Sequence, residues 1–259
     1  MSVKRSSRYL GSFLNYSSSL MPQLFIDLDG VLADFNSGVV NLLGYEPELL
    51  DRGVAPDSID DERIRINTTR KKDMWRRLSP KSSVSVSSEF FATLDFMPGA
   101  EKLWEVAKKH NAVVLTGCPE GGWAQTQKVL WCSRKLGLDP DAFFHSQLCP
   151  GCSCGEERMG VGSNKCFRCK VCCGDACKGW RGSSEKQVRI ITCTKRDKGR
   201  QALSWLEQEG RAHEGAVLVD DLLEQSTYWA QDRRHVNFSF VHHVDVDTSL
   251  SRLREMGFE

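Results

Sequence analysis

The most restrictive feature of this sequence is a regular alternation of short apolar runs with amphipathic segments. The apolar runs occupy residues 24–30, 112–116, 188–193 and 216–219, and residues 238–241 are typical of a further strand at a sheet edge. Between them, residues 99–110, 123–136 and 198–209 carry apolar side chains at the helical spacing i, i+3 and i+4. Because strands alternate with helices, the sequence predicts an α/β fold with a doubly wound parallel sheet.

Two segments interrupt this alternation and divide the chain. Residues 36–95 are mostly polar, with helical patterns at 37–43 and 72–78, and residues 147–187 are rich in cysteine. We therefore expect one core made of residues 24–146 and 188–259, with an insert at 36–95 and a second insert at 147–187. Residues 1–23 carry Lys4, Arg5 and Arg8 but no acid, which is typical of a disordered leader or of an organelle transit peptide.

Composition excludes several classes of protein. The 259 residues are 40% hydrophobic and 27% charged, which is close to globular averages and excludes disorder or a fibrous architecture for most of the chain. The net charge of +1 gives no global electrostatic reason for a nucleic-acid or membrane partner. The sequence lacks a continuous apolar run of the ~18 residues that a membrane span needs, and it lacks the apolar core of a secretory signal. We expect an intracellular protein.

Acidic residues follow two of the predicted strands. Asp27 and Asp29 end the first run, Thr116 ends the second, and Asp220 and Asp221 follow the run at 216–219. Ligands of open parallel sheets bind at the carboxyl ends of the strands, so these side chains are expected to converge. Clustered carboxylates repel one another unless a cation neutralises them, and oxygen ligands favour Mg²⁺. The alternative is that these acids cap helices.

These residues resemble motifs of the haloacid dehalogenase superfamily of phosphohydrolases. The matching positions are DLDGV at 27–31, Thr116, Lys198 and the pair Asp220-Asp221, in the family's order. Within the superfamily the chain is most similar to the 5'(3')-deoxyribonucleotidases, through residues 27–35, 90–100, 128–131, 196–198 and 218–221. The resemblance implies a Rossmann-like core, and it makes residues 36–95 a mainly helical cap over the active site.

The resemblance also implies roles for single residues. Asp27 would be the nucleophile and a Mg²⁺ ligand, and Asp29 would be the general acid and then base, with its backbone carbonyl on Mg²⁺. Thr116 and the Gly117 backbone would bind phosphate, Lys198 would neutralise it, and Asp220 and Asp221 would complete the Mg²⁺ site. The choice between the last two is open, with Asp221 preferred.

For several positions the sequence leaves more than one role open. Lys195 competes with Lys198 for the phosphate-binding role, and Lys128 is expected to be an exposed helix lysine, with phosphate contact as the alternative. The nucleotidases follow the threonine of motif II with serine, whereas this chain has the glycine-rich stretch GCPEGG at 117–122, whose N–H groups could replace the missing hydroxyl. Phe35 and Trp75 could stack a base, but core packing is the commoner use of such residues.

Eight of the 11 cysteines gather in the segment 147–187. They are Cys149, Cys152, Cys154, Cys166, Cys169, Cys172, Cys173 and Cys177. Two CxxC pairs separated by thirteen residues are typical of a structural Zn²⁺ site, and the remaining four could hold a second Zn²⁺. Disulfides and an iron–sulfur cluster are the less favoured alternatives, and Cys118, Cys132 and Cys193 are expected to be buried packing residues.

The same cysteine-rich insert carries basic and aromatic residues. They are Lys165, Phe167, Arg168, Lys170, Lys178, Trp180 and Arg181. Interleaved cations and rings are typical of a single-strand nucleic-acid contact, and the alternatives are a solvated loop or a protein-docking knob.

The predicted function is hydrolysis of a phosphomonoester, dependent on Mg²⁺ and proceeding through an aspartyl-phosphate. A nucleotide is the favoured substrate, which makes the expected enzyme 5'-nucleotidase-like. One alternative is a 3'-phosphatase that processes nucleic-acid ends and holds the strand with the zinc insert. The other is a non-catalytic zinc-bearing interaction module. A cytoplasmic location is expected, with mitochondrial or plastid targeting as the alternative.

Overall fold

The computed structural model describes nine stretches of the chain, and these include the strands of one sheet. They are residues 21–46, 61–79, 82–86, 89–119, 123–146, 180–181, 186–211, 214–231 and 237–259. Residues 1–20 of the leader predicted at 1–23, and nearly all of the cysteine-rich insert, lie outside the described residues.

The sheet has seven strands, in the order β4-β3-β5-β2-β1-β6-β7. Their bounds are β1 Gln23–Ile26, β2 Val113–Gly117, β3 Phe143–His145, β4 Trp180–Arg181, β5 Ile190–Cys193, β6 Ala216–Asp220 and β7 Phe238–His242. All neighbours pair in parallel except β3 and β4, which are antiparallel. The predicted α/β fold with a parallel sheet is confirmed, and β7 lies at the sheet edge, as expected.

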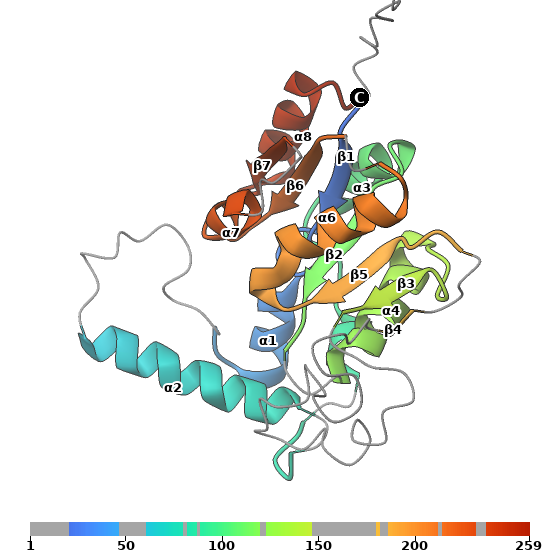
Figure 1. Cartoon of the computed structure of the whole chain (residues 1–259). Coiled ribbons are helices and arrows are strands. Elements are labelled where there is room, and N and C mark those ends of the chain that lie inside the picture. The colour runs from blue at the N-terminus through green and yellow to red at the C-terminus, as the bar shows by residue number, and fades with distance from the viewer. Residues whose placement is uncertain are drawn as a thin grey trace, which may run out of the picture.

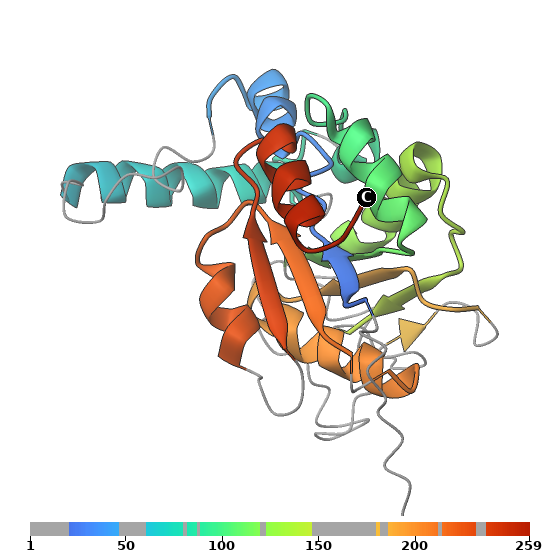
Figure 2. The ribbon, with the colours of Figure 1, turned by 90° about the horizontal axis from the view of Figure 1, so that it is seen from above.

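Helices cover both faces of this sheet (Figures 1 and 2). Their bounds are α1 Phe35–Leu43, α2 Asp61–Leu78, α3 Ala100–Lys109, α4 Trp123–Leu136, α6 Lys198–Gln208, α7 Gln225–Gln231 and α8 Val246–Glu255, with 3₁₀ turns η2 Phe90–Thr93 and η3 Lys195–Asp197. One core cluster joins α1–α4 and α8 to one face of the sheet, and a second joins α6 and α7 to the other. Figure 2 shows β1 between these two helical layers.

The composition of the strands follows from this cover. Leu24 and Ile26 enter the first cluster while Phe25 enters the second, so neighbouring residues of β1 bury opposite faces. A strand that is buried on both faces reads as a continuous apolar run, because no face is left for polar side chains. The same reason makes β1, β2 and β6 recognisable in the sequence.

Several elements differ from the sequence prediction, among them β3, β4 and α2. β3 was not predicted, because a three-residue strand is too short to show a period, and β4 adds residues from the predicted cysteine-rich insert to the sheet edge. α2 begins at Asp61 rather than near residue 72, and its polar first half lacks the apolar stripe that would have marked it. The described residues contain no helix with the length and apolar character that crossing a membrane requires.

Burial of His145 on β3 is expected to lower the free energy of unfolding in acid. The side chain is 1% exposed, its Nδ1 lies 2.7 Å from Thr192 Oγ1, and burial lowers its pKa to about 4. Unfolded histidine titrates near 6.5, so only the unfolded state gains this proton as the pH falls from 6.5 to about 4. We expect this group to remove about 3 kcal/mol of unfolding free energy over that window. Urea unfolding at several pH values should show a flatter profile for His145→Gln, and parallel profiles would contradict the prediction.

Candidate active site

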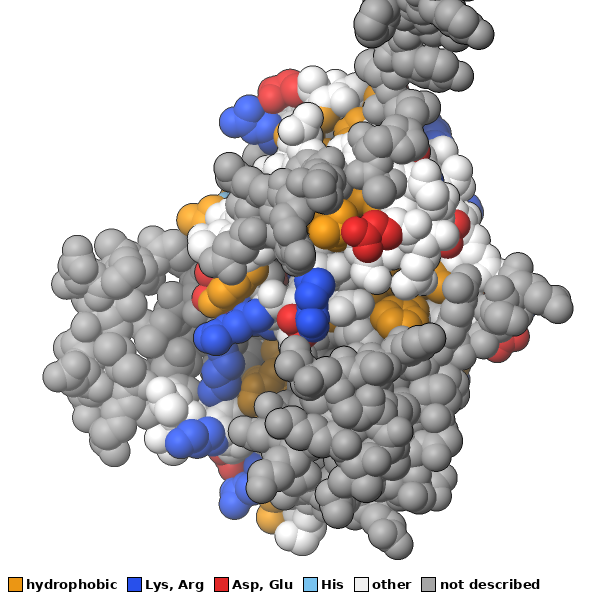
Figure 3. Space-filling model, in the orientation of Figure 1, with side chains coloured by type: hydrophobic (Ala, Val, Ile, Leu, Met, Phe, Trp, Pro, Cys, Tyr) orange, Lys and Arg blue, Asp and Glu red, His pale blue; other side chains and the backbone are white. Residues whose placement is uncertain are grey.

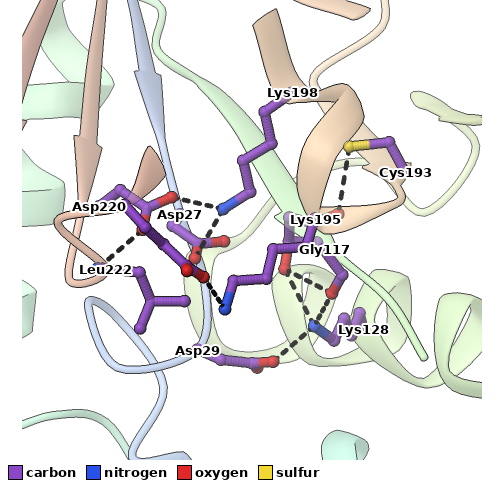
Figure 4. A network of polar contacts seen from close by, with 11 residues as sticks. Asp27, Asp29, Gly117, Lys128, Cys193, Lys195, Lys198, Asp220 and Leu222 are labelled. Carbon is purple, nitrogen blue, oxygen red and sulfur yellow. Dashed lines mark hydrogen bonds and ion pairs between the residues drawn. The ribbon is translucent and has the colours of Figure 1, made fainter. Parts of the chain in front are cut away.

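The carboxyl ends of β2, β1 and β6 bring the predicted acidic residues to one place. Asp27 follows β1 directly, and its N–H donates to Val219 O of the neighbouring strand at 2.9 Å. Asp220 ends β6 and Thr116 lies near the end of β2. Figure 4 shows the Asp27 and Asp220 side chains pointing toward the ammonium of Lys198, which lies at the start of α6.

Three carboxylates form the centre of this site. Asp27, Asp220 and Asp221 each offer an oxygen, and these oxygens all lie within 4.8 Å of one another. Asp27 and Asp220 are buried, and Asp27 Oδ1 has no hydrogen-bond partner among the described residues. Burial raises the pKa of Asp220 to about 6, and burial together with the charge of Asp27 raises the pKa of Asp221 well above its usual range. This incompletely compensated set of oxygens fits Mg²⁺.

Lys198 is the lysine that belongs to this carboxylate cluster. Its Nζ lies 2.8 Å from Asp27 Oδ2 and 2.6 Å from Asp220 Oδ2, and the side chain is buried. Burial alone would lower the pKa of Lys198, but Asp220 and Asp27 raise it above its usual value, so the ammonium stays charged. Lys195 instead pairs with Glu224, and both side chains are partly exposed.

Asp220 also makes a local contact in the turn after β6. Its Oδ1 accepts a hydrogen bond from Leu222 N at 2.9 Å, while its Oδ2 contacts Lys198. The next helix, α7, begins only at Gln225, so Asp220 does not take the helix-capping role that was the alternative. Asp221 has a different neighbour, Gly30, which lies in the turn after Asp29.

The prediction that Lys128 is an exposed helix lysine is wrong. Its side chain is completely buried on α4, and its Nζ lies 2.6 Å from Asp29 Oδ2 and 2.9 Å from Thr116 Oγ1. Asp29 therefore points toward Lys128 in Figure 4 and is absent from the three-carboxylate group. Burial raises the pKa of Asp29 although Lys128 opposes the shift.

The glycine-rich stretch after β2 is described only in part. A Cβ built on Gly117 would lie 3.4 Å from Lys195 Cα, so the backbone of η3 packs closely against this turn. Residues 120–122 lie outside the described residues, and the prediction that N–H groups of this turn replace the missing hydroxyl stays a prediction.

Phe35 and Trp75 belong to an aromatic cluster beside the site. Their ring centroids are 5.8 Å apart, and Phe35 stacks on Phe91 at 6.0 Å. Both rings are partly buried and pack against the larger core cluster, which gives them the packing role that was the commoner interpretation.

All eight cysteines of the predicted zinc insert lie outside the described residues, so the zinc prediction stays untested. Of the remaining three, Cys132 and Cys193 are fully buried, as predicted. Cys118 differs from the prediction, because it is only partly buried, although it packs against the larger core cluster; the loss of solvent around its thiol raises the pKa of that thiol to about 12.

Gly30 provides a test of how tightly Asp221 is held. Its φ is +78°, and an added Cβ would lie 2.3 Å from Asp221 Oδ2. Gly44 has a φ of +77° with open space around it, so Gly44→Ala carries the same backbone strain without the collision. We expect Gly30→Ala, but not Gly44→Ala, to weaken Mg²⁺ binding by about 10–100-fold, measured by calorimetric titration. Equal affinities in the two variants would contradict the prediction.

Comparison with known proteins adds little to this geometry. No protein-family model matches the chain, and no curated protein sequence matches it. Among solved structures, the chain is similar to a haloacid dehalogenase-like family hydrolase from Streptococcus pneumoniae. The identity is 11%, the alignment covers 88% of this chain and 90% of that chain, and the TM-score is 0.38. A likeness this remote does not bear on activity.

Proposed function

We propose that the protein is a Mg²⁺-dependent phosphomonoester hydrolase that acts through an aspartyl-phosphate on Asp27. The observation that carries this proposal is the arrangement of Asp27, whose Oδ2 is paired with Lys198 while its buried Oδ1 has no partner among the described residues. One oxygen each of Asp27, Asp220 and Asp221 lies within 4.8 Å of the others, which is close enough for the three carboxylates to share a cation. The same residues, in the same order along the chain, carry the resemblance to the haloacid dehalogenase motifs.

The residues suit the two halves of such a reaction. The Asp27 carboxylate attacks phosphorus as the bond to the leaving oxygen breaks, and Asp29 gives that oxygen a proton. Asp29, now a carboxylate, then takes a proton from the water that attacks the aspartyl-phosphate, which restores Asp27 and releases phosphate. Lys198 and Thr116 stabilise negative charge on the phosphoryl oxygens. Mg²⁺ held by Asp27, Asp220, Asp221 and the Asp29 carbonyl would neutralise the remaining charge of the phosphoryl group.

A panel of phosphomonoesters tests the proposal. Nucleoside monophosphates, sugar phosphates and p-nitrophenyl phosphate should be assayed with Mg²⁺ and with EDTA, and metal content should be measured by mass spectrometry. We expect Mg²⁺-dependent release of phosphate, with nucleotides favoured by the resemblance to deoxyribonucleotidases. Absence of turnover together with absence of Mg²⁺ binding would favour the non-catalytic interaction module.

A second candidate substrate, the phosphorylated end of a nucleic acid, is favoured by the surface of α2. Figure 3 shows Lys and Arg side chains gathered over this part of the molecule. Arg70, Lys72 and Arg76 are exposed, and Asp73 is the single acid between residues 68 and 78. Arg76 is paired with Asp73 at 2.9 Å, but Lys72 and Arg76 are like charges at i and i+4, and a polyanion would reduce their repulsion.

Comparing a phosphorylated oligonucleotide with a mononucleotide separates these substrates. If the end of a strand is the substrate, its KM at low salt should be at least about tenfold lower than that of the mononucleotide and should rise with salt. Alanine at Arg70, Lys72 and Arg76 should remove this advantage, whereas alanine at the exposed Lys102, Lys108 and Lys109 of α3 should keep it. Equal KM values would favour the nucleotide.

A further inference from the structure

The buried ammonium of Lys128 is the least expected feature of the site. Lys128 Nζ contacts three oxygens: Asp29 Oδ2 at 2.6 Å, Gly117 O at 2.6 Å and Thr116 Oγ1 at 2.9 Å. A lysine ammonium has three donors, so these contacts use all of them. The Phe91 ring lies on another side, with its centroid 4.7 Å from Nζ. Three oxygens and one aromatic ring therefore hold the Lys128 ammonium in place, and it has no donor left for a substrate.

These contacts fix one oxygen of Asp29 and leave the other unpaired. Asp29 Oδ2 accepts from Lys128, whereas Asp29 Oδ1 is itself buried and has no hydrogen-bond partner among the described residues. The Asp29 side chain as a whole keeps 25% of its surface exposed, so it lies at the boundary between the buried interior and the open part of the site. An acid that must meet a leaving oxygen benefits from such anchoring, because a displacement of about 1 Å can cost a large part of the rate.

Thr116 is oriented by the same lysine. Its Oγ1 accepts from Lys128, and its own hydroxyl hydrogen makes only a long contact of 3.4 Å to Gly117 O. That hydrogen has no shorter contact among the described residues, and the Thr116 side chain itself is buried. One ammonium thus links the turn after β1, the end of β2 and α4.

A purely structural role explains this arrangement less well. A buried ion pair is weak evidence for stability, because apolar residues of similar size often replace such pairs without loss. Ala124, Trp131 and Cys132 surround position 128 on the buried face of α4, so an apolar residue would fit the local pattern. Gln125 and Lys128 are the polar residues among the buried side chains of α4, and the contacts of Lys128 lead to Asp29 and Thr116.

We propose that Lys128 is a positioning residue that holds Asp29 for proton transfer and orients the Thr116 hydroxyl. The inference rests on the proposed function, in which Asp29 protonates the leaving oxygen as its bond to phosphorus breaks. Once that proton has left, the Asp29 carboxylate stays paired with the Lys128 ammonium, which stabilises the product of the transfer.

Substrates that differ in leaving group test this role. An alkyl phosphate such as a nucleoside 5'-monophosphate needs a proton on its leaving oxygen, whereas p-nitrophenolate leaves without one. We expect Lys128→Met to lower kcat for the alkyl ester about 10²–10³-fold and for p-nitrophenyl phosphate at most about tenfold, with KM little changed. Lys135→Met is the matched control, because Lys135 lies on the same helix, is partly exposed and contacts Asp95 at 3.8 Å.

A second variant keeps the test valid if Lys128→Met folds poorly. The double variant Asp29→Asn with Lys128→Met removes both charges of this pair, so neither is left buried without its partner. A positioning residue adds nothing once its target is gone, so the double variant should match Asp29→Asn on both substrates. Further loss in the double variant, or equal loss on both esters with a raised KM, would overturn the inference and indicate direct phosphate binding. Wild-type protein that hydrolyses neither ester would overturn the proposed function, and the inference with it.

Discussion

Replacing Asp27 with Asn is expected to abolish Mg²⁺-dependent phosphate release, with a loss of the order of 10⁴-fold or more. An amide cannot attack phosphorus as a carboxylate does, and it also supplies one fewer charge to the cation site. The fold should survive, because Asp27 lies close to Asp220 and Asp221 and its negative charge disfavours their ionised forms. We expect the metal-free variant to unfold at the same temperature as the wild type or higher.

Steady-state kinetics measures the loss of activity, and thermal unfolding measures whether the fold is retained. Both should be carried out with and without Mg²⁺. The matched control is Asp197→Asn, which changes a partly exposed acid paired with Arg200 and should keep full activity. Mg²⁺ should raise the unfolding temperature of the control but have little effect on Asp27→Asn. Turnover of Asp27→Asn at a wild-type rate would refute the aspartyl-phosphate mechanism.

Lys198→Met has the second largest expected effect, because it acts on stability as well as on activity. The substitution leaves Asp27 and Asp220 buried without the ammonium that contacts both. Breaking a buried ion pair from one side costs about 3–5 kcal/mol of unfolding free energy. We also expect kcat to fall about 10²–10³-fold, since a cation facing the phosphoryl oxygens is lost. Urea unfolding and kinetics in excess Mg²⁺ would measure the two losses separately.

Lys195→Met is the matched control for this prediction. Lys195 is 42% exposed and pairs with the exposed Glu224, so its removal should change stability by no more than about 1 kcal/mol. The pair of variants also decides between the two lysines that the sequence left as alternatives. Equal losses in both variants would contradict the assignment of Lys198 to the site.

The sequence predicted the strands and the convergence of their acids for a physical reason. A strand covered on both faces must be apolar throughout, so β1, β2 and β6 stand out from the polar segments around them. The acids that end β1 and β6 could then be placed at one sheet edge, because parallel strands share the direction of their carboxyl ends. β3 could not be found this way, since its three residues are too few to show a pattern.

The partners of the buried lysines depended on tertiary structure. Lys128 follows Ala124 by four residues and precedes Cys132 by four, so it occupies the apolar stripe of α4, and this spacing could have signalled its burial. No spacing could have paired it with Asp29, because the two are 99 positions apart along the chain.

The sequence by itself thus determined the α/β class and the edge of the sheet where the acids gather, since periodicity and strand direction are local properties of the chain. Tertiary structure alone decided that Lys198 rather than Lys195 joins Asp27 and Asp220, and that Asp29 is paired with Lys128. The reason is that a buried charge requires a counter-charge within a few ångströms, and which charges meet is fixed by how distant segments pack.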